Sequence, residues 1–208
     1  QAGDLNAIPH NLDTQFDATT TEFRLIRADL GSGSSHFLLT ATLKDYGHPE
    51  IAGHYQARLN GSEMRWILHT PSIPTGWIDT NGAAIYRDQP GQPFLRQLEV
   101  HGTLSSRQLD VKAAGTAVQL NTVRATYSLS GGNLEVQNFR GQILGGELLA
   151  GLKVRDLGGN SHGELTANAR RRSLDGLKRL APSTTAARNL SLSGIVDANA
   201  KVQWGKNL

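Results

Sequence analysis

The strongest constraint on the fold of this chain is a period of two in its apolar residues. Between residues 190 and 204 the even positions hold small or apolar residues, and the odd positions are polar except at Ile195. Successive side chains of an extended strand point to opposite sides of a sheet, whereas a helix repeats about every 3.6 residues. The pattern therefore predicts a strand with one apolar face. Its residues are Leu190, Leu192, Gly194, Val196, Ala198, Ala200, Val202 and Trp204.

The same alternation recurs along most of the chain and predicts a mainly β protein made of long antiparallel strands. Apolar residues occupy every second position in several further segments. These segments are residues 37–43, 51–59, 64–68, 98–104, 148–154 and 165–169. The phase of the alternation changes between Leu120 and Val123 and again between Val136 and Phe139. A slip of one residue would turn the apolar face outward, so we expect β-bulges or bends at both places.

Glycine and asparagine mark the expected turns. Asn60-Gly61 lies between two alternating runs and predicts a hairpin, and Asn81-Gly82 predicts a second one. We also expect turns at the glycine pairs of the later half of the chain. These pairs are 131–132, 145–146 and 158–159. Residues 71–93 contain four prolines, at 71, 74, 90 and 93, and are expected to be the least regular part.

One short helix is expected near residues 173–181. Ser173 can cap its start, and leucines at 174, 177 and 180 form an apolar stripe. Pro182 would end it. One short helix cannot cover the apolar face of many strands, so the sheet must curl on itself, close, or leave its concave side for an apolar ligand. The plain alternative is the filled core of an ordinary sandwich or barrel.

Composition and motifs argue against a catalytic, metal or nucleic-acid function. The formal net charge is +3, and basic residues are scattered except at Arg170–Arg172. Proteins that bind nucleic acid concentrate such charge on one face, so we expect this chain to bind no nucleic acid. Cysteine is absent, and no HExxH or GxSxG motif occurs. We therefore expect no enzyme activity and no cofactor, and we interpret His48 and His54 as solvated rather than as metal ligands.

The segment Gly31-Ser-Gly-Ser-Ser-His36 looks at first like a phosphate-binding loop. It lacks the lysine and the following helix of such a loop, so we interpret it as a hairpin turn. No run approaches the roughly 20 apolar residues of a membrane helix. The first ten residues lack the regions of a signal peptide, so we expect an excerpt of a longer chain.

The second half resembles the AsmA-like and TamB family of bacterial envelope proteins. The resemblance rests on an ordered series of strand and turn phrases: residues 127–136, YSLSGGNLEV; 139–151, FRGQILGGELLAG; 163–169, GELTANA; 173–177, SLDGL; and 192–198, LSGIVDA. It covers roughly residues 98–204, and residues 13–70 look like a more degenerate copy of the strand pattern. No single phrase is diagnostic; the order of the phrases is the specific feature.

The resemblance implies an elongated, half-open β groove, or β-taco, that runs as one continuous segment through residues 1–208. Residues 1–97 would be degenerate strand repeats and residues 98–208 the family-like part. Such a protein lies in the periplasm, anchored in the inner membrane through a part of the chain not present here. It shields and conducts phospholipid acyl chains between the inner and outer membranes. The alternatives are a scaffold for outer-membrane protein assembly through exposed strand edges, and a closed β domain that binds carbohydrate or protein.

The expected partner is therefore phospholipid, held by its acyl chains. The residues expected to line the groove are apolar and share one parity. They are Leu148, Leu152, Val154, Leu165, Leu190, Leu192, Val196, Val202 and Trp204.

Overall fold

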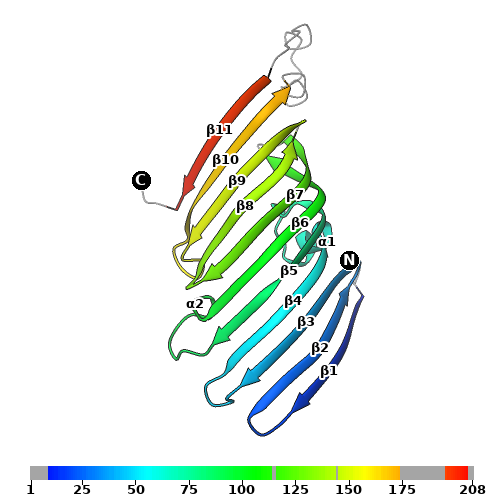
Figure 1. Cartoon of the computed structure of the whole chain (residues 1–208), viewed down its shortest axis with the longest axis vertical. Coiled ribbons are helices and arrows are strands. Elements are labelled where there is room, and N and C mark those ends of the chain that lie inside the picture. The colour runs from blue at the N-terminus through cyan, green and yellow to red at the C-terminus, as the bar shows by residue number, and fades with distance from the viewer. Residues whose placement is uncertain (1–8, 114–115, 144, 174–194, 206–208) are drawn as a thin grey trace, which may run out of the picture.

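The fold is one antiparallel sheet of eleven strands in the order of the chain. The computed structural model describes residues 9–113, 116–143, 145–173 and 195–205. Each strand pairs with its neighbours in sequence, and the sheet is open at both edges (Figure 1). The strands are β1 (His10–Ala18), β2 (Glu22–Ser32), β3 (Ser35–Lys44), β4 (Glu50–Asn60), β5 (Thr75–Arg87), β6 (Leu98–Ala113), β7 (Thr116–Ser130), β8 (Asn133–Ile143), β9 (Gly146–Arg155), β10 (His162–Ser173) and β11 (Ile195–Trp204). Two short helices join them, α1 (Gly61–Ile67) and α2 (Phe94–Gln97).

The register confirms the mainly β prediction and shows why the alternation produces one apolar face. Val136, Leu152, Leu165 and Val202 are successive partners across β8 to β11. Directly opposed residues of an antiparallel sheet point to the same side, so residues of one parity gather on one face over the whole sheet.

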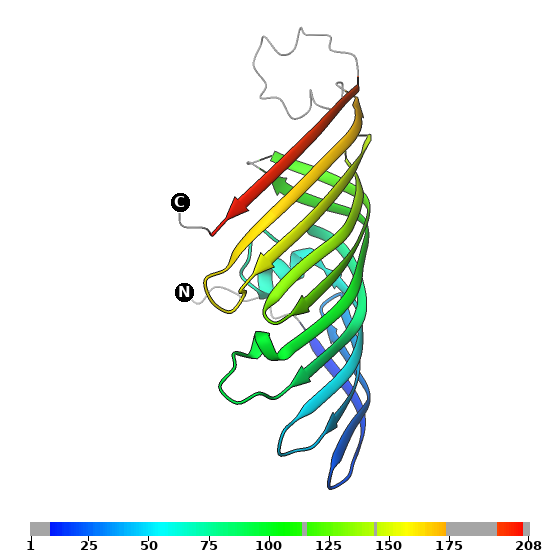
Figure 2. The ribbon, with the colours of Figure 1, turned by 60° about the vertical axis from the view of Figure 1, so that its left-hand side comes forward.

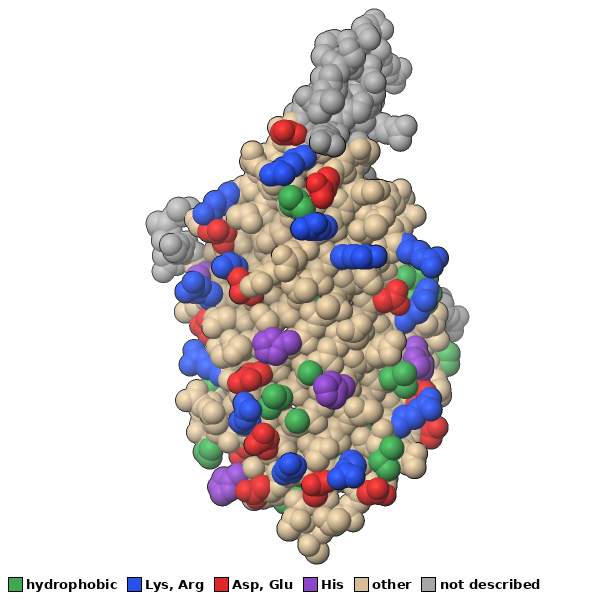
Figure 3. All heavy atoms as spheres, viewed as in Figure 1, with side chains coloured by type: hydrophobic (Ala, Val, Ile, Leu, Met, Phe, Trp, Pro, Cys, Tyr) green, Lys and Arg blue, Asp and Glu red, His purple; other side chains and the backbone are tan. Residues whose placement is uncertain are grey.

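The sheet bends so that its apolar face is the inner one. Figure 2 shows it bowed, with α1 and α2 on the concave side. The outer face carries scattered Lys, Arg, Asp, Glu and His side chains (Figure 3). A small buried cluster of Leu109, Leu120, Val123 and Ile143 forms the core on the inner side, and all four come from β6, β7 and β8. The closed alternative is wrong, because the eleven strands form one sheet that is not closed into a barrel.

Bulges keep the apolar residues on the inner face, as the phase changes predict. The register shifts between Asn121 and Arg124 and between Val136 and Phe139. Thr122 and Asn138 sit inside these shifts with positive φ values of 52° each. Each extra residue restores the parity of the strand, so the apolar side chains on both sides of it stay on the concave face.

Several predicted turns are confirmed. Residues 33 and 34 join β2 to β3, and Gly131-Gly132 joins β7 to β8. Residues 158 and 159 lie in the connection between β9 and β10, and Gly145 directly precedes β9. Gly33, Gly131, Gly132 and Gly145 all have positive φ. Glycine adopts that conformation without a steric penalty, which is why these positions could be identified from sequence.

The hairpin predicted at Asn60-Gly61 and the strand predicted over residues 64–68 are wrong. Asn60 ends β4 and caps α1, its side chain accepting hydrogen bonds from the backbone N–H groups of Ser62 and Glu63. Asparagine suits a helix N-cap as well as a turn, so the local signal is ambiguous. The choice is made by packing, because a Cβ at Gly61 would lie 2.0 Å from the carbonyl oxygen of Pro74.

The hairpin predicted at Asn81-Gly82 is also wrong, since both residues lie inside β5. Residues 71–93 are therefore not irregular throughout: 13 of them form one continuous strand. Gly82 is present for space rather than for a turn, because an added Cβ would lie 2.2 Å from the carbonyl oxygen of His101. The helix predicted near 173–181 lies outside the described residues beyond Ser173, which itself ends β10.

Replacing Gly82 with alanine should destabilise the sheet. The new methyl group would meet the backbone of β6 as well as the Tyr55 hydroxyl, 2.5 Å away, so the strands must shift. Overpacking of this kind costs about 1–3 kcal/mol. Gly151→Ala is the matched control, since its Cβ would find only ordinary contacts of 3.4 Å or more. Urea denaturation should show a lower unfolding free energy for Gly82→Ala alone; equal midpoints would contradict this explanation.

Candidate functional site

The candidate site is the concave apolar face of the sheet. No second layer of comparable size covers this face within the described ranges, where only the short segments α1 and α2 lie on it (Figure 2). Ten strand spacings of about 4.8 Å give the face a length of roughly 50 Å across the strands. Among the strand residues of this face, the exposed large apolar side chains lie near the two edges of the sheet rather than at the middle, where the buried cluster lies.

The predicted lining residues fall into three groups. Leu165, Val202 and Trp204 lie on the concave face and are 37%, 51% and 40% exposed. Leu152 is half-buried beside Leu165, Leu148 packs against the core cluster, and Val154 is buried at 9%. Leu190 and Leu192 lie outside the described residues. Val196 of β11 pairs with Arg172 of β10, and the side chain of Val196 also lies outside the described part.

The opposite end of the concave face carries exposed apolar residues that the sequence reasoning missed. Leu12, Phe16 and Leu30 are 66%, 56% and 37% exposed. The ring of Phe16 lies 5.3 Å from that of Phe23 on the neighbouring strand. The register between β1 and β2 shifts between Gln15 and Phe16, where β2 carries one extra residue, Ile26. Leu12, Thr14 and Phe16 occupy alternate positions and so indicate a strand face, but the run is short and Thr14 is polar.

A hydrogen-bonded pair of tyrosines crosses the floor of the concave face. Tyr55, Gly82, Gly102 and Tyr127 are successive register partners on β4, β5, β6 and β7. The two glycines leave room for the tyrosine side chains to meet above them, with 2.5 Å between the hydroxyl oxygens. A Cβ at Gly102 would lie 2.5 Å from the Tyr127 ring and 2.7 Å from the Tyr55 hydroxyl.

The hydroxyls of Tyr55, Tyr127 and Thr80 form a relay of hydrogen bonds. The direction of this hydroxyl relay follows from its last acceptor. Thr80 Oγ1 donates to the carbonyl oxygen of Thr103 over 2.9 Å, which uses its only hydrogen. Tyr127 must therefore donate to Thr80, 2.6 Å away, and Tyr55 must donate to Tyr127. Burial raises the pKa of the Tyr55 hydroxyl above its usual value, and the hydrogen bond to Tyr127 raises this pKa further. The relay satisfies its own donors inside an apolar surface.

The connection between β5 and β6, which contains α2, folds over the concave side at one set of strand ends. The ring of Tyr86 stacks on that of Phe94 at 5.6 Å. Arg96 of α2 forms an ion pair of 3.3 Å with Asp156, in the connection between β9 and β10. At the opposite strand ends, α1 contacts β4 and β5 and exposes Trp66 and Leu68.

The loop that looked like a phosphate site holds a carboxylate of the same chain. Glu63 of α1 accepts hydrogen bonds from the backbone N–H and the hydroxyl of both Ser34 and Ser35, at 2.6 to 3.1 Å. Burial acts to raise the pKa of Glu63, but the bonds from the two serines outweigh it, and the pKa is lowered. The turn at 31–36 is confirmed, and its anion-binding groups tie α1 to the β2–β3 hairpin.

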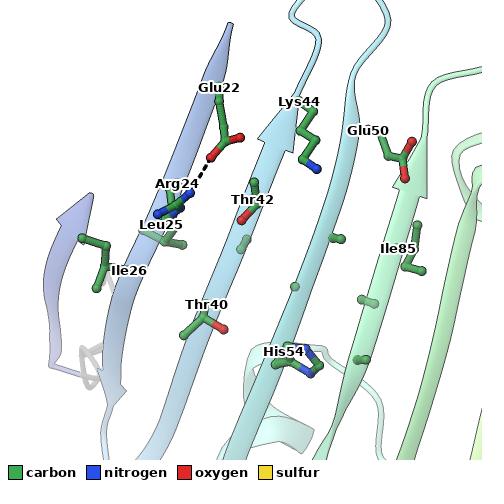
Figure 4. Close-up of a pocket in the computed structure, with 15 residues that line it drawn as sticks. Glu22, Arg24, Leu25, Ile26, Thr40, Thr42, Lys44, Glu50, His54 and Ile85 are labelled. Atoms are coloured by element: carbon green, nitrogen blue, oxygen red, sulfur yellow. Dashed lines mark hydrogen bonds and ion pairs between the residues drawn. The ribbon is translucent and has the colours of Figure 1, made fainter. Parts of the chain in front are cut away.

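A shallow hollow of about 710 Å³ opens on the outer face over β2 to β5 (Figure 4). The lining side chains that Figure 4 labels are Glu22, Arg24, Leu25, Ile26, Thr40, Thr42, Lys44, Glu50, His54 and Ile85. Arg24 is paired with Glu22 at 2.9 Å. Two acidic and two basic side chains balance around the hollow, so it favours neither an anion nor a cation.

The histidines do not form a metal centre in the described part of the chain. His48 lies 3.8 Å from Asp45, and His54 lies on the outer face in the hollow of Figure 4. Among residues 9–113, 116–143, 145–173 and 195–205, no three His, Asp or Glu residues cluster as metal ligands. Within the same ranges, no helix has the length and apolar character needed to cross a membrane.

Comparisons with known proteins identify no relative of this chain. No family model, curated protein or solved structure matches it.

The relay predicts unequal effects for its two tyrosines. Tyr127→Phe removes both the acceptor of Tyr55 and the donor to Thr80, whereas Tyr55→Phe removes only one bond. At about 1 kcal/mol per bond, Tyr127→Phe should lower the unfolding free energy by about 2 kcal/mol and Tyr55→Phe by about 1. Urea denaturation of the two single variants and the double variant measures this. Equal losses for the two single variants would contradict the direction of the relay.

The raised pKa of Tyr55 makes the fold sensitive to alkali. Because the pKa is higher in the folded state than in the unfolded chain, where it is about 10, the stabilisation is complete below pH about 10 and is lost above it. The unfolding free energy should therefore fall as pH rises past about 10, and Tyr55→Phe should flatten that fall. Denaturation at a series of alkaline pH values tests this. A fall of the same slope in both proteins would exclude Tyr55 as its source.

Proposed function

We propose that this chain is a groove segment of the AsmA-like and TamB type, which shields phospholipid acyl chains from water as they pass between the inner and outer membranes. The proposal places it in the periplasm. The observation that carries it is the open concave apolar face, exposed at both ends of the sheet. Leu12, Phe16 and Leu30 are exposed near β1, and Leu165, Val202 and Trp204 near β11.

The driving force would be transfer of methylene groups from water to this face. Each buried methylene contributes about 0.8 kcal/mol, so one acyl chain gains several kcal/mol even from partial cover. Val136, Leu152, Leu165 and Val202 form a row in register at right angles to the strands. A chain lying along this row meets similar side chains at each strand, so no single position holds it tightly.

The polar atoms on the floor support the same function. The hydroxyls of Tyr55, Tyr127 and Thr80 have their hydrogens directed to one another and to the Thr103 carbonyl oxygen. A passing acyl chain therefore meets aromatic ring and methyl surface at this point rather than an unsatisfied donor. An unsatisfied donor would cost about 1–3 kcal/mol on contact with an apolar ligand, and it would act as a barrier to movement.

Leu165→Asp tests the proposal, with Thr166→Asp as its control. The two residues are adjacent in β10 and are both exposed, and the alternation places them on opposite faces. A carboxylate at Leu165 would have to be desolvated beneath an acyl chain, which costs several kcal/mol. Crosslinking to a photoactivatable phospholipid should fall at least about tenfold for Leu165→Asp and stay unchanged for Thr166→Asp.

Thermal melting must accompany the crosslinking, so that loss of binding is separated from loss of the fold. Val202→Asp, at a side chain 51% exposed on the edge strand, gives a second variant on the same face. The proposal fails if Leu165→Asp and Val202→Asp remain folded and crosslink lipid as well as the parent protein does.

A further inference from the structure

Two arginines of the outer face lie directly opposite each other on interior strands of the sheet. Arg124 of β7 is the register partner of Arg140 of β8, and both strands have a neighbour on each side. Both arginines are exposed. Their neighbours in sequence, Val123 and Phe139, belong to the buried cluster or pack against it. Because successive residues of a strand point to opposite sides, the two guanidinium groups lie on the outer face.

This pair departs from the charge pattern of the rest of the outer face. Glu135 is opposite Lys153, with 2.9 Å between the charged atoms, and Glu50 is opposite Arg87. Opposed residues of unlike charge stabilise an antiparallel pair, whereas like charges directly opposite each other destabilise it. The register of Arg124 with Arg140 therefore carries an electrostatic cost.

A second pair of like charge, Asp13 with Asp29, is compensated by counter-ions. Arg27 and His36 both bind the carboxylate of Asp29. The arginine pair has no such compensation. Within the described residues, neither of its guanidinium groups forms an ion pair or a side-chain hydrogen bond.

Bulges on both sides hold the arginine pair in place. The β7–β8 register shifts between Asn121 and Arg124 and again between Arg124 and Thr126. Thr122 and Asn138 lie within these shifts, and a positive φ is uncommon for a β-branched residue such as threonine. Bulges redirect side chains and are frequent beside functional sites, as are strained backbone positions.

Neutral hydrogen-bonding groups surround the two arginines. Ser105 of β6 is the partner of Arg124 on its other side, and Asn121 and Gln142 are opposite each other in the adjoining row. Within the described residues, none of these three side chains has a hydrogen-bond partner. Their hydroxyl and amide groups are therefore available to a ligand held by the arginines.

A shallow hollow of about 560 Å³ adjoins Arg140. Asn121, Gln142 and Glu147 also line it. In the register, Glu147 is opposite Gln142 and Arg170 rather than Arg140. The two guanidinium groups outweigh this one carboxylate, so the site as a whole attracts anions.

A phosphate group matches this arrangement in charge and in geometry. A guanidinium presents its donors in a planar fork that binds two oxygens of one phosphate. Opposed Cα atoms of an antiparallel pair lie about 4.5–5.5 Å apart, so two opposed arginines reach the same group. A phosphate between them would replace the repulsion of like charges with two charge-assisted contacts.

We propose that Arg124 and Arg140 form a binding site for a phosphate group on the outer face, with Ser105, Asn121 and Gln142 as neutral donors. A phosphorylated small molecule and the headgroup of an anionic phospholipid both carry such a group, and experiment distinguishes the two sources. The site lies on the opposite face from the acyl-chain surface, so the inference goes beyond lipid shielding and does not depend on it.

Calorimetric titration with inorganic phosphate at constant ionic strength measures the site directly. Arg124→Gln and Arg140→Gln should each weaken binding at least about tenfold, because each removes a charge-assisted contact. Arg140→Lys keeps the charge but loses the fork, so it should also bind more weakly than the parent protein.

Arg87→Gln is the matched control. It removes the same charge from the same face, but Arg87 is already paired with Glu50 and Glu99. Phosphate binding should therefore be unchanged. Thermal melting checks the fold, and phosphate should raise the melting temperature of the parent protein but not that of Arg140→Gln.

Cosedimentation with vesicles identifies the source of the phosphate group. Binding to phosphatidylglycerol vesicles that is lost in Arg124→Gln and Arg140→Gln, and retained in Arg87→Gln, assigns the lipid headgroup. Binding of inorganic phosphate without binding to these vesicles assigns a phosphorylated small molecule.

The proposal is overturned if the parent protein binds neither phosphate nor the vesicles. It is also overturned if folded Arg124→Gln and Arg140→Gln bind as tightly as the parent protein, or if Arg87→Gln loses as much affinity as they do. The phosphate titration contains no lipid and the acyl-chain test changes the other face. Failure of either proposal therefore leaves the other intact.

Discussion

A sheet with one apolar face and no second layer must cover that face with its own curvature, and the rest of this structure follows from that constraint. The buried cluster comes from three neighbouring strands of one sheet rather than from two opposed layers. Curvature brings inner side chains together and spreads the outer ones, so apolar residues are favoured inside and charged ones outside. The Tyr55–Tyr127 bond marks this curvature, because the two rings meet across two intervening strands only where both carry glycine.

The same constraint explains where the surface remains open. Curvature covers the middle of the sheet, where inner side chains converge, but strands near an edge have neighbours on one side only. Exposed apolar residues of the inner face therefore gather near β1 and near β11. The segments that contain α1 and α2 add cover between these ends, one tied down by Glu63 and the other by Arg96. The two ends of the concave face are the places where a ligand can make contact.

The sequence predicted the features that depend on parity and failed where distant contacts decide. Alternation identified the strands, and its phase changes located the bulges at Thr122 and Asn138. Asn60-Gly61 and Asn81-Gly82 both have the local signature of a hairpin. Gly61 packs against Pro74, and Asn60-Gly61 begins a helix. Gly82 packs against the backbone of His101 and the side chain of Tyr55, and Asn81-Gly82 lies inside a strand. Neither contact can be read from neighbouring residues.

The candidate site was predictable to a similar extent. Parity placed Leu165, Val202 and Trp204 on the concave face, where they are exposed. It could not separate them from Val154, which has the same parity but is buried at 9%, because burial depends on position along the curve. The exposed residues of β1 were missed because their alternation is short and includes the polar Thr14. The hydroxyl relay was missed because its four strands converge only in three dimensions.

The most direct test of the account is native mass spectrometry of the protein purified without detergent from a bacterial host. If the concave face shelters acyl chains, the spectrum should contain adducts with phospholipid masses. Leu165→Asp should remove these adducts while Thr166→Asp retains them. A parent spectrum of bare protein alone, or adducts that persist in folded Leu165→Asp, would contradict the account.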